Sequence, residues 1–164
     1  MLQSVAAYSN YFEGVRRRTL NYIHAIPPEG IGWAPKPGEF NCGELIRHFG
    51  AAEKMFTRVA TEGIWSYPGH SSTGQESLEA AIASLEEDHL EALKRLGSIS
   101  DEDLFKSQPS INGPPIKVWR WLMALVEHEI HHRSQLAVYL TMMGVEAPHI
   151  FGLGVEEIIA RTTG

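Results

Sequence analysis

The sequence has one cysteine, Cys42, and no long apolar segment. A single cysteine cannot form a disulfide within the chain and is typical of a reducing compartment. The longest uninterrupted apolar run, from Trp121 to Val126, is far shorter than the roughly 20 residues that a helix needs to cross a membrane. The first residues also lack the basic and apolar segments of a secretion signal. We therefore expect a cytoplasmic protein with no membrane association.

Positive charge is also scarce in this chain. With 14 basic and 20 acidic side chains, the formal net charge is −6, which gives no general attraction to nucleic acid or anionic lipid. The one basic cluster, Arg16 to Arg18, consists of adjacent residues that spread around most of a helix circumference and form no stripe. Nucleic acid is therefore not expected as a partner.

Breaks in the apolar pattern divide the chain into helices. Pro27 and Pro28 end the first segment of helical spacing, and Asn41 followed by Glu44 has the spacing of a helix N-cap with its reciprocal acid. Proline and glycine clusters separate the later segments. The predicted helices span residues 2–26, 41–62, 75–96 and 116–143, with a short fifth helix at 154–162.

These helices predict an all-α protein that folds as one domain over residues 1–164. No segment has the alternating pattern of a strand, and a hydrophobic content of 43% is sufficient for a packed core. The fourth helix is apolar on nearly two faces, which indicates a central place in a four-helix bundle or contact with a second subunit. The fifth helix is expected to cover one end of the bundle.

Three histidines carry the strongest chemical signal in the sequence. His128 and His132 are four residues apart on the fourth helix, so both imidazoles project from one face and can hold a single ion. His48 lies at an inward position of the second helix, within the apolar stripe that begins at Leu45. Three neutral imidazoles from two helices predict a site for Zn²⁺ or a similar ion, with coordination positions left open.

Other residues offer weaker candidates. His131 is also spaced to pair with His128, but it lies nearer the edge of the inward face. Cys42, at the start of the second helix, would have its pKa lowered by the helix dipole, but it points away from the histidine face and is interpreted as structural. The remaining histidines lie in predicted loops, at a helix end or on a polar face and are interpreted as solvated: His24, His70, His89 and His149.

Residues 128–132 also match the HExxH pattern of zinc proteases, in which the glutamate acts as the base. The extended form of that pattern requires glycine where Gln135 stands. No strand pattern supplies the sheet that such proteases use to bind a peptide. A protease of this class is therefore not favoured.

Several short motifs occur in an order that resembles the DinB/YfiT-like family of metal-binding four-helix bundles. They are Trp33-Ala-Pro-Lys-Pro-Gly38, Gly43-Glu-Leu-Ile-Arg-His48 with Glu53, His128-x-x-x-His132-Arg133-Ser-Gln135, and Met143-Gly-Val145 with Pro148 and Phe151-Gly152. The resemblance extends from near residue 5 to near residue 155. It implies up-down-down-up connections, one divalent metal ion held by His48, His128 and His132, and often a homodimer. Ser134 is a small departure, since the family often has glycine there.

The resemblance also implies a range of activities. Members of the family include thiol-dependent S-transferases, a mycothiol-dependent isomerase and a metal-dependent hydrolase, and many have no assigned activity. An all-histidine site leaves the ion an open position, at which the pKa of bound water would fall to about 7 and a thiol would also be acidified. We expect Zn²⁺ or Ni²⁺ and a low-molecular-weight thiol as a small-molecule substrate.

The sequence assigns no catalytic residue. Four side chains are candidates to orient the ligands or the substrate: Glu44, Glu129, Gln135 and Tyr139. Three alternatives to a thiol S-transferase stay open, namely a metal-dependent hydrolase, a non-catalytic metal-binding or stress-related protein, and a helical interaction module whose histidines hold no metal.

Overall fold

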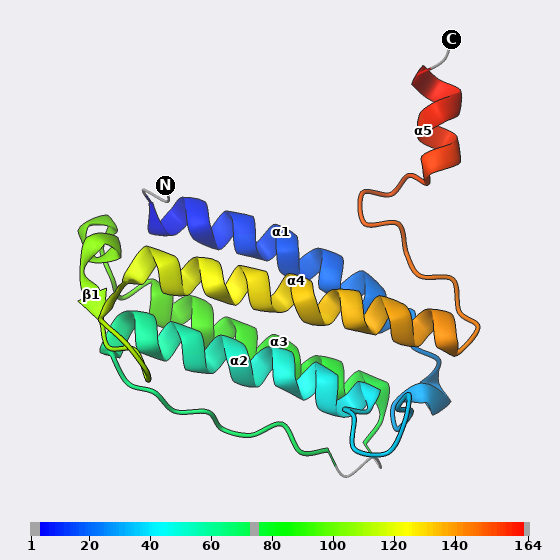
Figure 1. The fold of residues 1–164 in the computed structure, drawn as a ribbon, viewed down its shortest axis with the longest axis horizontal. Helices are drawn as coiled ribbons and strands as arrows, with labels where there is room; N and C mark the ends of the chain where they lie inside the picture. The colour runs from blue at the N-terminus through cyan, green and yellow to red at the C-terminus, as the bar shows by residue number, and fades with distance from the viewer. Residues whose placement is uncertain (1–3, 73–75, 163–164) are drawn as a thin grey trace.

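Four long helices make up the body of the protein (Figure 1). The computed structural model describes residues 4–72 and 76–162. The long helices are α1 (Val5–His24), α2 (Cys42–Glu62), α3 (Leu78–Leu96) and α4 (Val118–Met142). The shorter elements are two 3₁₀ helices (Pro28–Gly30 and Asp101–Phe105), an antiparallel pair of strands, β1 (Ser107–Gln108) and β2 (Ile116–Lys117), and the terminal helix α5 (Val155–Thr162). The prediction of an all-α fold is confirmed.

Local side-chain caps explain where the helices begin. The Asn41 side chain accepts a hydrogen bond from the Glu44 backbone N–H, and the Glu44 carboxylate accepts one from the Asn41 backbone N–H. This reciprocal pair satisfies two donors that the first turn of α2 would otherwise leave unpaired. Ser4 and Ser77 cap α1 and α3 in the simpler way, each accepting from one backbone N–H. The N-cap predicted at Asn41 is confirmed.

The helices follow one another around the bundle in the order α1, α4, α2, α3. Extensive contacts join α2 to both α3 and α4, and α1 packs mainly against α4, whereas α1 and α3 touch only sparsely. Figure 1 shows α2 and α3 running in one direction and α1 and α4 in the other. The α2–α4 seam and the α1–α3 seam therefore lie on opposite sides of the bundle.

A layer of buried charged residues divides the core. One apolar cluster lies on one side of it and includes Ile23, Leu45 and Leu136, and a second lies on the other side and includes Phe12 and Leu125. Each long helix contributes one residue to the layer between them, and all four are buried: Arg16 (α1), Glu53 (α2), His89 (α3) and Glu129 (α4). We call these four residues the polar layer.

Hydrogen bonds connect the polar layer into one network. Arg16 donates from Nε and Nη2 to the two carboxylate oxygens of Glu129 at 2.8 and 2.7 Å, and from Nη2 to Glu53 Oε2 at 2.8 Å. His89 Nδ1 donates to Glu53 Oε1 at 2.6 Å. The bidentate geometry suits a guanidinium in an interior, where an unpaired charge would be costly.

Three expectations about the chain need correction. No strand was expected, but the connection between α3 and α4 contains a 3₁₀ helix and a short hairpin of β1 and β2. Helix α5 does not cover the bundle end, because it buries none of its residues and stands away from the four helices (Figure 1). His89, interpreted as solvated, is a buried member of the polar layer.

Two further points concern the surface. No helix within residues 4–72 and 76–162 combines the length and apolar character needed to span a membrane. Helix α4 leaves Ile130, Val138 and Met142 partly exposed on its outer face. The homodimer expected through this helix stays a prediction.

We expect replacement of Arg16 to destabilise the protein strongly. Arg16→Met leaves two buried carboxylates without their shared cation, a change that typically costs about 3–5 kcal/mol in free energy of unfolding. The matched variant Arg17→Met removes the same charge from an exposed neighbour and should change stability by about 0.5 kcal/mol or less. Urea denaturation measures both values. Equal stability of the two variants would show that the layer contributes little.

Candidate metal centre

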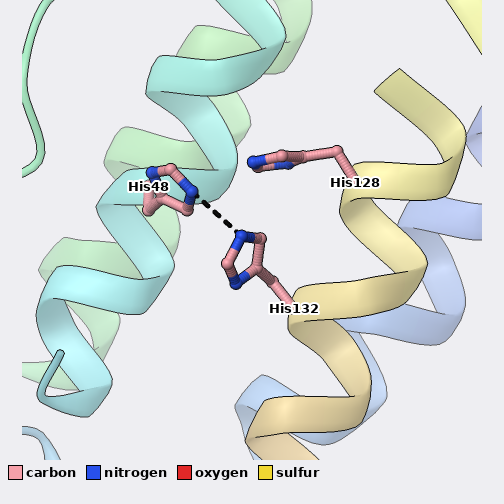
Figure 2. Close-up of side chains that lie close together, drawn as sticks. All are labelled: His48, His128 and His132. Atoms are coloured by element: carbon pink, nitrogen blue, oxygen red, sulfur yellow. Dashed lines mark hydrogen bonds between the residues drawn. The ribbon is translucent and has the colours of Figure 1, made fainter. Parts of the chain in front are cut away.

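Three imidazoles meet between α2 and α4. His48 comes from α2, and His128 and His132 come from successive turns of α4 (Figure 2). One ring nitrogen of each lies within 4.8 Å of the others, and Nε2 of His48 is 3.1 Å from Nε2 of His132. Nitrogens that share one tetrahedral Zn²⁺ at about 2.0–2.1 Å are separated by about 3.3 Å, so this spacing fits a common ion. Among the described residues, no other group of three histidine, cysteine or acidic side chains is so close.

Hydrogen bonds orient two of the three rings. His132 Nδ1 donates to Gln135 Oε1 at 2.8 Å, and Gln135 Nε2 donates to the Tyr139 hydroxyl at 2.8 Å. His48 Nδ1 donates to the Tyr67 hydroxyl at 2.7 Å, which in turn donates to His70 Nδ1 at 2.5 Å. With hydrogen on Nδ1, each ring presents the lone pair of Nε2 to the centre of the site. This is the arrangement that ligating histidines usually have.

The environment keeps these imidazoles neutral. Burial, reinforced by the neighbouring histidines, lowers the pKa of His48 to about 3 and that of His128 to about 4. The pKa of His132 is lowered as well, mainly by burial, although its hydrogen bond to Gln135 opposes the shift. Neutral imidazoles have the free lone pairs that a cation needs, and at pH 7 a metal would not compete with protons for them.

Aromatic side chains surround the three histidines. The ring of Phe56 lies next to that of His128, with centroids 5.8 Å apart. The ring of Trp121 is 6.3 Å from that of Phe56, and the ring of Trp65 is 5.0 Å from that of Trp121. On the other side, the ring of Phe40 is 5.2 Å from that of His48. Phe56, Trp121 and Trp65 are all partly exposed, so apolar surface is available beside the site.

Of the four residues predicted to orient ligands, Gln135 and Tyr139 lie at the site. Glu44 forms the N-cap of α2, and Glu129 binds Arg16 in the polar layer. His131 is exposed and lies outside the group of three, although its ring is 4.9 Å from that of His132.

Two residues at the site were missed by sequence reasoning. Tyr67 and His70 belong to the loop after α2, and the interpretation of His70 as solvated is wrong because its ring packs against Phe40 and His48. Helical spacing says nothing about which loop side chains return to a helix. Cys42 also differs from expectation, since burial raises the pKa of its thiol to about 11 instead of lowering it.

Comparison with known proteins identifies the family of this chain. Residues 11–136 match the DinB superfamily, which is well over half of the chain. The chain belongs to the DinB superfamily. No curated protein is similar enough to count as a match to this member of the superfamily.

Solved structures support the same fold. A DinB-like protein from Bacillus subtilis has a TM-score of 0.70 and 23% sequence identity, with 88% of this chain and 96% of that chain covered. A DinB-like protein from Bacillus cereus ATCC 10987 has a TM-score of 0.67 and 20% identity, with 91% and 99% covered. At these identities the likeness establishes that this chain shares the fold of these DinB-like proteins. It gives no information about activity.

We expect the Tyr67 hydroxyl to strengthen metal binding. Tyr67→Phe removes the acceptor that fixes His48, and loss of such an outer partner typically lowers metal affinity about 10–100-fold. Tyr11→Phe, an exposed tyrosine on α1, is the matched control and should bind as the unmodified protein does. Competition with a chromophoric zinc chelator measures the affinities. An unchanged affinity for Tyr67→Phe would mean that the loop does not orient the ligand.

Proposed function

We propose that this DinB-superfamily protein is a metal-dependent enzyme that activates a low-molecular-weight thiol for transfer to an electrophile. The supporting observation is the donor set, because burial favours the neutral form of His48, His128 and His132, and no carboxylate or thiol in the described part of the chain completes their group. His48, His128 and His132 would hold a Zn²⁺ or Ni²⁺ ion, which would keep its full charge and would lower the pKa of a thiol or water that binds to it.

The side chains around the histidines have separate parts in this proposal. Gln135 and Tyr67 hold the rings of His132 and His48 in one orientation. Phe56 and Trp121 offer apolar surface next to His128, which favours an electrophile with an apolar or aromatic body.

The sulfur nucleophile has to come from a second substrate. Cys42 is the only cysteine of the chain, and it is buried with a raised pKa, so it cannot supply a thiolate at neutral pH. In the proposed reaction the thiol loses its proton to solvent, its sulfur forms a bond to an electrophilic carbon, and the leaving group departs with its bonding electron pair.

We expect metal-dependent thiol transfer with at least one of bacillithiol, mycothiol, glutathione and cysteine, tested with an activated aryl halide. If the metal lowers the thiol pKa by one unit, the thiolate population rises about tenfold, and the nucleophilicity of that thiolate falls about threefold. The reaction rate should therefore rise about threefold for each unit. The absorbance of the aryl thioether reports the rate, and metal-free protein is the control.

Two other outcomes would contradict the proposal. No acceleration with any thiol, together with metal-dependent cleavage of an ester or amide, would assign the site to a hydrolase. Absence of both activities in metal-loaded protein would leave a non-catalytic metal-binding protein.

A further inference from the structure

A cavity lies on the opposite side of the bundle from the three histidines. It has a volume of about 410 Å³ and opens along the seam where α1 and α3 make few contacts. Leu20, Leu85 and Leu90 form its apolar walls. Its volume falls within the range of about 300–1,000 Å³ that small-molecule sites occupy.

Two members of the polar layer, Arg16 and His89, also line this cavity. Nη1 of Arg16 and Nε2 of His89 are shielded from solvent and have no hydrogen-bond partner among the described residues. Buried polar atoms in native proteins are rarely left unpaired. The remaining nitrogens of both side chains are engaged by Glu53 and Glu129, so these two atoms are the ones left with hydrogen-bonding capacity.

The surroundings favour a hydrogen-bond donor at both Arg16 Nη1 and His89 Nε2. Arg16 is a permanent donor. Burial alone would lower the pKa of His89, but the hydrogen bond and charge of Glu53 outweigh it and raise this pKa, which favours the form with hydrogen on both nitrogens. In that form the two cations of the polar layer balance its two carboxylates, so the layer itself has no net charge that would repel an anion.

Glu13 indicates which ligand chemistry fits. Its half-exposed carboxylate stands at the cavity with Oε1 3.5 Å from His89 Nε2, close enough for an ion pair but too far for a good hydrogen bond. A carboxylate is therefore already placed beside the unpaired nitrogen. Because the side chain is half exposed, it can swing outward and leave this place to another carboxylate.

We propose that the α1–α3 cavity binds a small carboxylate with an apolar tail. The ligand carboxylate replaces that of Glu13 and accepts hydrogen bonds from Arg16 Nη1 and His89 Nε2. The tail lies against Leu20, Leu85 and Leu90. This proposal does not rest on the metal centre or its proposed activity, because the cavity lies at the α1–α3 seam and the three histidines lie at the opposite α2–α4 seam.

The test is a titration of zinc-loaded protein with hexanoate, followed by backbone amide NMR. Zinc is added first, so that any binding of the carboxylate to the ion appears as shifts near His128 and not on α1 and α3. Hexanoate should shift the amides around Leu20, Leu85 and Leu90 at millimolar concentration or below, and hexanol should bind at least about tenfold more weakly because it cannot pair with a cation.

Variants at the rim and floor make the test specific. Glu13→Ala removes the carboxylate that competes with hexanoate for His89, and it should tighten hexanoate binding several-fold. Glu86→Ala is the matched control, because it removes a negative charge from the same rim that forms no ion pair with His89, and its effect should be smaller. Arg16→Lys keeps the charge but loses Nη1 and should weaken binding about tenfold. Leu90→Trp, at a largely exposed rim position, should block the cavity without affecting folding.

Three results would overturn the proposal. They are equal binding of hexanol and hexanoate, shifts confined to α2 and α4, and no binding to the folded Glu13→Ala protein, which would mean that the cavity holds only water.

Discussion

The arrangement of the helices depends on the hydrogen bonds that the Arg16 guanidinium donates to two buried carboxylates. This guanidinium binds Glu53 of α2 and Glu129 of α4 at once, and Glu53 binds His89 of α3. Because both carboxylates share one cation, α2 and α4 cannot slide past each other without leaving a buried charge unpaired. Glu129 directly follows His128, and Glu53 follows His48 by little more than one turn. The polar layer therefore sets the register that brings the imidazoles of the two helices together.

The bundle holds two regions of different character. At the α2–α4 seam lie the three histidines with Tyr67, Gln135 and aromatic surface, and at the α1–α3 seam, on the opposite side of the bundle, lies the cavity with its unpaired donors. A buried ion network is a poor source of net stability compared with apolar packing, so its use here favours a role in specificity. Arg16 and His89, which belong to the layer that fixes the register of the helices, also line the α1–α3 cavity.

Periodicity in the sequence predicts the parts of the molecule that rest on helix geometry. The i, i+4 spacing of His128 and His132, and the inward position of His48, are properties of single helices, so they predict that each of these rings faces the core. That the rings lie together depends in addition on the packing of α2 against α4. The N-cap at Asn41 is equally local. Where the chain is described, the long helices begin and end close to the predicted residues, because capping and proline signals act within one turn. The predicted helical residues 2, 3 and 75 lie outside the described part of the chain.

Features that depend on contacts distant in the sequence could not be predicted in this way. Tyr67 reaches His48 from a loop, and no local pattern records that contact. His89 lies between acidic residues in the sequence, a pattern that predicts a polar, exposed helix face. Its burial is explained only by the positions of Arg16 and Glu53 in the folded protein. The pKa of Cys42 shows the same limit, since the helix dipole is a local effect whereas desolvation depends on the whole fold.

The most direct test of the metal centre is the zinc content of protein prepared without a histidine tag, after dialysis against zinc and then against buffer. The unmodified chain and the His131→Ala control should each retain close to one equivalent, whereas His48→Ala, His128→Ala and His132→Ala should each retain little. Retention well below half an equivalent by the unmodified chain, or loss of metal on changing His131 with retention on changing His132, would contradict the site described here.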